Sequence, residues 1–479
     1  MVDNNIKYMN MNATLQNDLN DFENILDQVK KQGIDYLNDL EKISTSNNEN
    51  IDTNRDLNEA GIGSLNALKE FNERLAPLIV SSSGPRYWGF VTGGSTPASI
   101  VGDWLATVYD QNTQAVKAQG GVSAQIEFET INLLLQLLSL PESFHGGFVT
   151  GATMSNFTCL GIARQWFGAQ FGKDFAKTGI TEKINILTAT PHSSSIKTLS
   201  MLGIGSQNYS VIKTIEGNRE AIDIEDLEKN IQTLNGKPFI FISSAGTVNT
   251  ADFDDFEAIS KLKTKYNFWW HIDAAFGGFA AVSDKYKHLV EGWENADSIT
   301  IDCHKWLNVP YESAFYLAKK EHTNLQIETF QNSNAPYLGN PLENFNYLNV
   351  LPENSRRLKA LPVWFSLLAY GKEGFCDIVE NSIQLALQFG NKLTENGNFE
   401  LLAPIRLNNV CFTLKGEHNQ EKVNQFLTAL NDTGKVFMTP TVYLGRKGIR
   451  ASFVNWRTKE EDIKIVIEEM RNVLAALDI

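Results

Sequence analysis

The sequence predicts an α/β protein built around a mostly parallel β-sheet. Between about residues 76 and 356, short and almost continuously apolar runs alternate with helix-like stretches. Apolar strands separated by helices are typical of a parallel sheet that helices cover on both faces. The chain has 479 residues, of which 42% are hydrophobic and 20% charged, so it can form a large core and more than one domain.

The first 75 residues are expected to form a helical segment without a core of its own. Its apolar side chains recur near helical spacing: Leu19, Phe22, Ile25, Leu26, Val29 and Leu37. Residues 44–56 are polar and should form a loop. A helix with one apolar stripe needs a partner, so this segment is expected to clasp the main body or a second subunit. A partly disordered tail is the alternative.

The central part, residues 76–355, is expected to be one large domain. Six short apolar runs in it are predicted strands: 147–149, 184–187, 239–242, 268–272, 298–301 and 314–317. Helix-like patterns at 155–167 and 256–265 lie beside several of them. In such sheets a ligand binds beyond the carboxyl ends of the strands, so functional residues are expected directly after these runs.

The remainder, residues 356–479, is predicted to form a smaller C-terminal α+β domain. A long helical pattern extends to residue 393, and a strand candidate follows at 409–414. The last helix is expected at 459–477, with Thr458 as its N-cap.

Composition excludes several classes of function. A formal net charge of −14 argues against nucleic acid or an anionic membrane surface as the main partner. No apolar run is long enough to span a bilayer and the N-terminus has no apolar targeting segment, so a cytoplasmic protein is expected. The cysteines form no CxxC pair, which favours neither a metal site nor a disulfide framework: Cys159, Cys303, Cys376 and Cys411.

Two predicted strands lead to residues that can carry chemistry. The run at 298–301 leads to the adjacent pair His304 and Lys305, and the run at 268–272 is followed by Asp273. A lone lysine beyond a strand is usually a surface residue. In an apolar neighbourhood, however, a lysine is costly to keep charged, and its neutral amine can attack a carbonyl. A carboxylate and an amine together suit pyridoxal phosphate, which has a basic ring nitrogen and an aldehyde.

Three other strand ends support a cofactor site. Residues 150–156 form a small-residue turn before a helix, where backbone amides, the helix dipole and the Thr153 hydroxyl can bind a phosphate. His192 can stack on a flat ring, and residues 243–248 place hydroxyl groups after a strand. Each signal alone also fits ordinary capping or a turn. Their conjunction with the lysine and the aspartate favours the cofactor.

From about residue 83 to residue 457, the sequence resembles the group II pyridoxal-phosphate-dependent amino acid decarboxylases of the aspartate aminotransferase fold. The resemblance rests on the joint pattern of His-Lys-Trp at 304–306 and His-Ile-Asp-Ala-Ala at 271–275 with the segments described above. It implies a large domain with a seven-stranded, mostly parallel sheet and pyridoxal 5'-phosphate as cofactor. Members share active-site walls between subunits, so a homodimer is implied. No metal, nucleic-acid or membrane partner is expected.

The resemblance assigns a role to each matching residue. Lys305 would form the internal aldimine with the cofactor, Asp273 would pair with the pyridinium nitrogen, and His192 would stack on the ring. Further implied cofactor contacts are Ala152 and Thr153 at the phosphate, His304 near it, Ala275 against the ring, and Thr247 and Asp302. The sequence departs from the family pattern at three positions: Val248 stands where many members have a threonine, Asp302 where some have an asparagine, and Met154 where a glutamate is common.

The implied reaction removes the α-carboxylate of an L-amino acid and yields an amine and carbon dioxide, which makes the protein a carboxy-lyase. Tyr337 matches the mobile-loop tyrosine that is thought to protonate the substrate carbon. Phenylalanine at that position accompanies aldehyde formation in the family, so Tyr337 favours simple decarboxylation. Phe90 and Thr92 would form an apolar pocket for the carboxylate, and Arg450 is the candidate cation for it.

The substrate and the rival reactions stay open at the level of sequence. Tyr87, Trp88 and Phe90 favour an aromatic substrate, whereas glutamate or aspartate would need a second cation, for which Arg86 is a candidate. Rivals with the same fold are an aminotransferase, a lyase and an aldehyde-forming decarboxylase. A non-catalytic binding protein is disfavoured because the lysine and the aspartate are both present.

Overall fold

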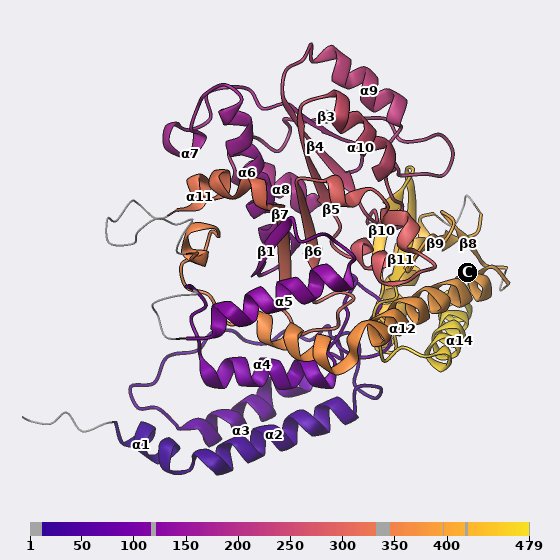
Figure 1. Cartoon of the computed structure of the whole chain (residues 1–479). Coiled ribbons are helices and arrows are strands. Elements are labelled where there is room, and N and C mark those ends of the chain that lie inside the picture. Colours follow the sequence, from indigo (N-terminus) through magenta and orange to yellow (C-terminus); the bar gives the residue numbers. More distant parts are fainter. Residues whose placement is uncertain (1–11, 116–120, 332–344, 396, 417–419, 479) are drawn as a thin grey trace, which may run out of the picture.

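The computed structural model of the chain describes residues 12–115, 121–331, 345–395, 397–416 and 420–478 (Figure 1). Within these residues the chain forms a seven-stranded sheet in its central part and a four-stranded sheet near its C-terminus. Tyr337, the predicted proton donor, lies outside the described residues. The helices of the N-terminal and central parts are α1 (Ala13–Asn20), α2 (Phe22–Asn38), α3 (Ser64–Arg74), α4 (Pro97–Tyr109), α5 (Ser123–Leu137), α6 (Ala152–Ala169), α7 (Phe175–Thr178), α8 (Ser193–Met201), α9 (Ile224–Thr233), α10 (Phe256–Lys265) and α11 (Thr323–Phe330).

The seven-stranded sheet is mostly parallel, as predicted. Its strands are β1 (Phe144–Val149), β2 (Ile186–Thr188), β3 (Ser210–Val211), β4 (Phe239–Ser244), β5 (Phe268–Asp273), β6 (Ser298–Asp302) and β7 (Ala314–Lys319), in the order β1-β7-β6-β5-β4-β2-β3. Strand β7 runs antiparallel to both of its neighbours, and the other pairs are parallel. The six predicted strands are confirmed. Strand β3 escaped prediction because it has only two residues, both exposed, and so gives no apolar signal.

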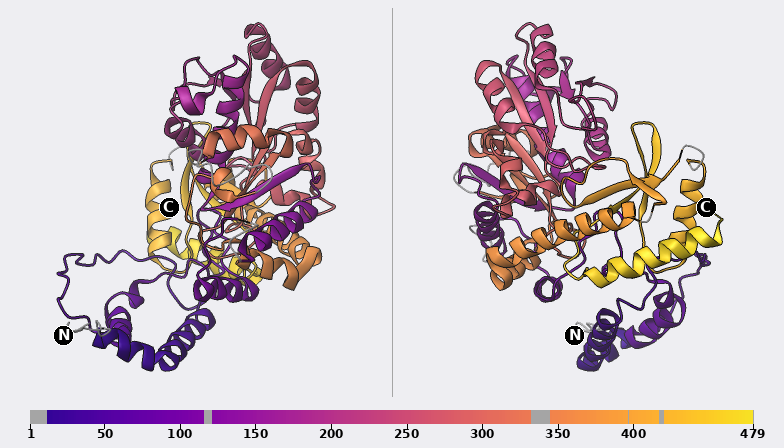
Figure 2. Two further views of the ribbon diagram at one scale, coloured as in Figure 1. Left: turned by 60° about the vertical axis from the view of Figure 1, so that its left-hand side comes forward. Right: turned by 90° about the vertical axis from the view of Figure 1, so that its right-hand side faces the viewer.

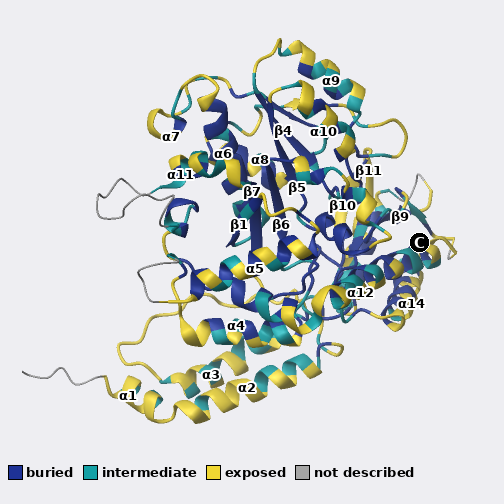
Figure 3. Cartoon of the chain, in the orientation of Figure 1, coloured by how far each residue is buried: buried dark blue, intermediate teal, exposed yellow. Residues whose placement is uncertain are grey.

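Helices cover both faces of this sheet. Consecutive residues of a strand point to opposite faces, and the tryptophans of β5 show it. Trp269 packs 6.1 Å, ring to ring, from Trp166 of α6, whereas Trp270 packs 6.0 Å from Phe256 of α10. The strands are therefore buried on both sides, which explains their nearly continuous apolar sequences (Figure 3).

The carboxyl ends of β1, β2, β4, β5 and β6 lie at one edge of the sheet. Strand β1 shares their direction because it is antiparallel to β7, which is itself antiparallel to β6. The loops that leave this edge carry the predicted phosphate turn, His192, Thr247, Ala275 and Lys305. The topology thus gathers segments that are far apart in the sequence.

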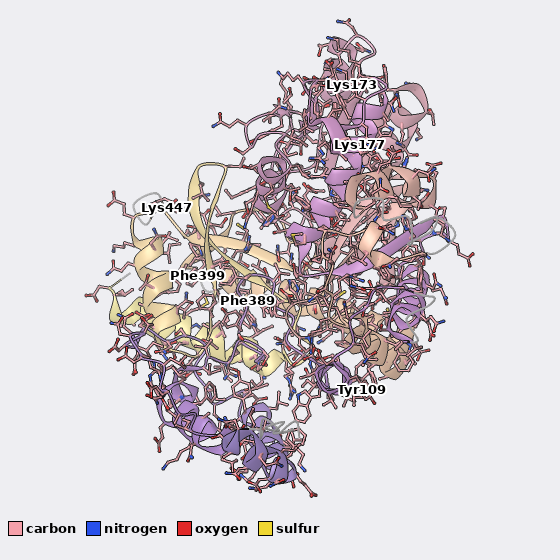
Figure 4. The ribbon with its side chains drawn as sticks, turned by 90° about the vertical axis from the view of Figure 1, so that its left-hand side faces the viewer. Tyr109, Lys173, Lys177, Phe389, Phe399 and Lys447 are labelled. Carbon is pink, nitrogen blue, oxygen red and sulfur yellow. The ribbon has the colours of Figure 1, made fainter. Side chains whose placement is uncertain are left out.

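The C-terminal part is an α+β unit with its own apolar cluster. It contains α12 (Ala360–Glu395), β8 (Phe399–Leu401), β9 (Asn409–Leu414), α13 (Lys422–Asp432), β10 (Thr439–Tyr443), β11 (Arg446–Ser452) and α14 (Glu460–Ala476). The antiparallel sheet has the order β10-β11-β9-β8. Phe389 of α12 and Phe399 of β8 each pack 5.8 Å from Phe412 of β9, in the interior of this unit (Figure 4). Helix α12 is bent at Gly371, where the backbone is not helical.

The cap of the last helix was predicted wrongly. Lys459 occupies the N-cap position, and α14 begins at Glu460, one residue later than predicted. The Asp462 carboxylate accepts a hydrogen bond from the backbone N–H of Lys459. The Thr458 hydroxyl instead donates a hydrogen bond to the Pro85 carbonyl, 2.7 Å away.

The N-terminal helices α1, α2 and α3 contain no buried residue. Figure 2 shows them at one end of the molecule, projecting from the body. Residues 44–56 form neither helix nor strand, as predicted, and Thr45 donates a backbone hydrogen bond to Gly434 of the C-terminal unit. The division of the chain at residues 75 and 355 stays a prediction.

Candidate active site

A cavity of about 230 Å³ lies at the carboxyl edge of the large sheet. Seven predicted site residues line it: Phe90, His192, Thr247, Asp273, Ala275, Lys305 and Arg450. They come from six different segments of the chain, and Arg450 belongs to β11 of the C-terminal unit. The structure therefore brings together residues that the sequence placed only at separate strand ends.

Lys305 forms an ion pair inside this region. Its Nζ atom lies 2.9 Å from Oδ2 of Asp302, and both side chains are largely buried. The ring centroid of Phe276 lies 5.7 Å from the same nitrogen. The expected apolar neighbourhood is therefore wrong in one respect, because a buried carboxylate of the preceding strand is the nearest partner of the amine.

Gly93 is packed against the backbone of Lys305. A Cβ atom added at Gly93 would lie 1.7 Å from the Lys305 carbonyl oxygen. The Gly93 N–H also donates to the carbonyl of His304, 3.2 Å away. Only glycine allows the segment that carries Phe90 and Thr92 to approach the lysine this closely.

Asp273 ends strand β5 at the cavity and accepts three hydrogen bonds. The donors are Nδ2 of Asn156 at 3.3 Å, Oγ of Ser195 at 3.2 Å and the backbone N–H of Ala275 at 3.3 Å. These donors stabilise a carboxylate in a buried position. Asn156 and Ser195 are functional candidates that the sequence did not identify, because an asparagine and a serine in helical segments carry no motif signal.

A chain of hydrogen bonds runs from the core to Asp273. His271 Nε2 lies 2.9 Å from Asn156 Oδ1, which can only accept, so Nε2 carries the proton. Nδ1 then accepts from the Ser298 hydroxyl, 2.9 Å away, and that oxygen accepts from the indole N–H of Trp269. Burial lowers the pKa of His271 to about 4 and so keeps the ring neutral. Each donor in the chain points toward the carboxylate.

His192 is oriented by the helix that it caps. As N-cap of α8, it accepts the backbone N–H of Ser194 at Nδ1, 3.2 Å away, and the Ser194 hydroxyl lies 2.7 Å from the same nitrogen. Burial lowers the pKa of the imidazole. The neutral ring therefore carries its proton on Nε2, and the capping contact fixes its position at the cavity.

His304 lies beside the cavity and is not on its wall. Its Nδ1 accepts the backbone N–H of Ser313 at 3.3 Å, and its ring packs 4.3 Å from that of Tyr311. Burial lowers the pKa of His304. Its Nε2 lies 3.8 Å from Asp302, which also pairs with Lys305.

The start of helix α6 fits a phosphate group. The helix begins at Ala152 and Thr153, and the preceding Gly151 provides no side-chain cap. A Cβ atom at Gly151 would meet only Cε1 of His304 within 4 Å, at 3.7 Å. Uncapped backbone N–H groups, a helix dipole and open space form an anion site. With Lys305 and Asp273 nearby, the residues fit pyridoxal phosphate.

The Thr247 hydroxyl is engaged away from any ligand. It donates to Oε2 of Glu220 at 2.5 Å and accepts the backbone N–H of Asp252 at 3.0 Å. Thr247 and Val248 both line the cavity. A cofactor contact through this hydroxyl would require it to leave a buried carboxylate.

The cavity wall also includes Phe90, Val91 and Arg450. Phe90 and Val91 both have positive φ angles, 55° and 60°, a strained conformation that is concentrated at functional sites. Thr92 is buried and does not line the cavity, and its hydroxyl lies 3.4 Å from that of Tyr311. Arg450 Nη1 donates to the Val248 carbonyl at 3.0 Å, and its buried Nε has no hydrogen-bond partner among the described residues.

The fold and the residues at the carboxyl edge of the sheet define a pyridoxal-phosphate enzyme. Residues 52–415 match the pyridoxal-dependent decarboxylase conserved domain, so the chain belongs to that family. It is a lyase of amino acid metabolism that removes carbon dioxide from an amino acid, with pyridoxal 5'-phosphate as cofactor.

Similar proteins agree with this assignment. The aromatic-L-amino-acid decarboxylase of Bacillus atrophaeus is 28% identical over 91% of this chain and 92% of that protein. A phenylacetaldehyde synthase of Arabidopsis thaliana is 24% identical over 83% of each chain. The fold matches crystal structures of Oryza sativa TDC with PLP and tryptamine, with a TM-score of 0.87 and 20% identity over 98% of this chain and 99% of that one. It also matches Catharanthus roseus tryptophan decarboxylase in complex with L-tryptophan, with a TM-score of 0.86 and 21% identity over 98% and 100%.

The structure also bears on membrane association. Among the described residues, every helix is too short or too polar to cross a membrane.

Proposed function

We propose that this decarboxylase acts on an aromatic L-amino acid and releases the corresponding amine. The observation that carries the proposal is the aromatic group at the cavity. Phe90 is 60% exposed and lies 5.8 Å, ring to ring, from Phe437, on which Tyr87 stacks at 4.7 Å. An exposed aromatic surface beside a reactive site favours a flat apolar side chain. The names of several similar proteins, among them tyrosine decarboxylases, support the same class.

An acidic substrate is disfavoured by the position of Arg86. Its guanidinium donates to the Asp462 carboxylate at 2.8 Å and to the carbonyls of Lys435 and Glu41. The second cation that glutamate or aspartate would need is thus already bound elsewhere. Arg450 lies on the cavity wall, where it would bind one substrate carboxylate.

The residues at the cavity would hold the cofactor in defined ways. Lys305 would anchor the cofactor through its amine, and Asp273 would accept a hydrogen bond from the protonated ring nitrogen. His192 would cover one face of the ring, with Ala275 nearby. The start of α6 at Ala152 and Thr153 would bind the phosphate, beside His304 and Asp302. When bound, pyridoxal phosphate accepts the electrons of the bond that breaks at the α-carbon.

The chain's own residues would decide which bond breaks. Arg450 would bind the substrate carboxylate and orient it, while Phe90 and Val91 would exclude water, with Thr92 behind them. Orientation of the scissile bond selects decarboxylation over transamination. An apolar surrounding favours loss of neutral carbon dioxide. The proton that replaces the carboxylate would come from Tyr337, which lies outside the described residues, or from Nε2 of His192.

A cytoplasmic homodimer is part of the proposal. Helices α1 and α2 expose six large apolar side chains that a second subunit would cover: Leu15, Leu19, Phe22, Leu26, Val29 and Ile34. The cysteines are all unpaired, which suits a reducing compartment. Light scattering of the purified protein at about twice the chain mass would support the dimer, and the mass of one chain would contradict it.

The proposed reaction is tested by screening amino acids for carbon dioxide release. Holoenzyme is incubated with tyrosine, tryptophan, phenylalanine, glutamate and aspartate, and carbon dioxide, amine and aldehyde are measured together. Amine from an aromatic substrate in equal amount to carbon dioxide supports the proposal. Aldehyde with carbon dioxide would favour the phenylacetaldehyde synthase type of reaction, which similar proteins represent. Preference for an acidic amino acid would contradict the substrate class.

A further inference from the structure

The guanidinium of Arg450 is held by the loop that follows strand β4. Its Nη1 donates to the Val248 carbonyl at 3.0 Å, and Nδ2 of Asn409 donates to the same oxygen, also at 3.0 Å. Both donors come from the C-terminal sheet, whereas residue 248 belongs to the central part. The position of this single carbonyl oxygen therefore fixes where the cation lies at the cavity.

Glu220 fixes the loop that presents this carbonyl. Its Oε2 atom accepts hydrogen bonds from the Thr247 hydroxyl at 2.5 Å, the Thr250 hydroxyl at 2.6 Å and the Thr250 backbone N–H at 3.2 Å. The donors lie on both sides of Val248, and both threonine side chains are buried. One carboxylate oxygen thus closes the loop around the residue that holds Arg450.

The charge of Glu220 serves the same arrangement. The carboxylate is 8% exposed and forms no ion pair with any residue that the structure describes. Burial lowers the pKa of Arg450, and the charge of Glu220 acts in the opposite direction. A negative charge behind the loop therefore offsets part of the cost of holding a cation at a largely buried site.

We infer that Glu220 is a positioning residue for the substrate carboxylate, which acts through Thr247, Thr250 and the Val248 carbonyl to hold Arg450 at the cavity. The inference rests on the proposed function, in which Arg450 binds that carboxylate. Glu220 does not line the cavity itself and touches no substrate. Its loss should weaken binding of ligands that carry an α-carboxylate and spare the amines that lack it.

The test compares three pairs of ligands that differ only in the α-carboxylate: tyrosine with tyramine, tryptophan with tryptamine, and glutamate with 4-aminobutyrate. Binding to holoenzyme is followed by the change in cofactor absorbance. For the pair that the wild type binds, Glu220→Gln should raise the dissociation constant of the amino acid about tenfold and that of the amine less than about twofold. The KM for the amino acid should rise together with its dissociation constant, while kcat changes little.

Two further variants sharpen the comparison. Thr250→Val removes one donor and keeps the Glu220 carboxylate, so it should raise the dissociation constant of the amino acid by about threefold. This variant also provides the test if Glu220→Gln does not fold. Thr441→Val is the matched control, because the Thr441 hydroxyl binds the neighbouring Asn249 of the same loop at 2.6 Å and does not contact the Val248 carbonyl. Thr441→Val should leave both ligands of a pair unchanged.

The inference is overturned if Glu220→Gln weakens the amino acid and the amine equally, or neither of them. It also falls if the wild type binds none of the pairs, because Arg450 then has no carboxylate to hold. Holoenzyme that binds a pair and releases no carbon dioxide would contradict the proposed reaction alone, since the comparison of dissociation constants does not depend on turnover.

Discussion

The Nε2 atom of His271 lies 2.9 Å from Oδ1 of Asn156, and the other end of that amide donates to Asp273. An amide has one acceptor and one donor end, so the histidine decides which end faces the carboxylate. The two residues belong to β5 and α6, and Asp273 is only two positions beyond His271 on the same strand. His271, a residue of the core, thereby orients the Asn156 amide that donates to Asp273.

Replacing Asn156 by aspartate should weaken cofactor binding strongly. The new carboxylate would lie beside Asp273, and two like charges at this distance cannot both stay ionised in a buried position. The dissociation constant for pyridoxal phosphate, measured by absorbance or fluorescence titration, should rise roughly 10- to 100-fold. Unchanged affinity would show that Asp273 has no role toward the cofactor.

His271 should make the folded protein sensitive to acid. Its pKa is about 4 in the folded chain, below the ordinary value of 6.5, so between these values the unfolded chain binds a proton that the folded chain does not. Stability from this group is complete above pH 6.5 and is lost as the pH falls toward 4. Between pH 7 and pH 5, its share of the free energy of unfolding should fall by about 2 kcal/mol. Urea unfolding of wild type and His271→Gln at both values should show the difference, and equal pH dependence of the two proteins would contradict it.

Lys305→Ala should abolish the visible absorbance band of bound cofactor and also destabilise the protein without cofactor. The substitution leaves the buried Asp302 carboxylate without its partner at 2.9 Å, which costs on the order of 2–4 kcal/mol. Adding Asp302→Asn should recover most of that loss, because no buried charge remains unpaired. Thermal unfolding of the two variants measures the recovery. A band that survives Lys305→Ala would remove the lysine from its role as anchor.

Tyr337→Phe should change the product more than it changes consumption of the substrate. If Tyr337 donates the proton, its loss lowers amine formation by roughly 10- to 100-fold. In aerated buffer the reaction is then diverted toward aldehyde, with dioxygen reduced to hydrogen peroxide and the nitrogen released as ammonia. Amine, aldehyde and carbon dioxide are measured in one assay. Undiminished amine production would assign the proton to another group, for which His192 is the next candidate.

Several candidate site residues could be predicted from the sequence because each of them follows an apolar run. Lys305 comes after β6 and His192 after β2, and strand ends at one edge of a parallel sheet converge. Features that depend on hydrogen bonds between distant segments were predicted less well. Thr458 has the pattern of an N-cap, yet its hydroxyl binds Pro85, which is 373 positions away. Strand β3 has two exposed residues and is defined only by its pairing with β2.

The sequence by itself determined the class of fold and the cofactor, and it proposed the residues that would bind the cofactor, because these inferences depend on local patterns: apolar runs, the motifs that end them and the turn before a helix. Only the tertiary structure decided the partners of those residues. It paired Lys305 with Asp302, turned the Thr247 hydroxyl to Glu220 and brought Arg450 to the Val248 carbonyl across 202 positions. Such hydrogen bonds form when distant segments pack together, and the residues that make them leave no periodic signal in the chain.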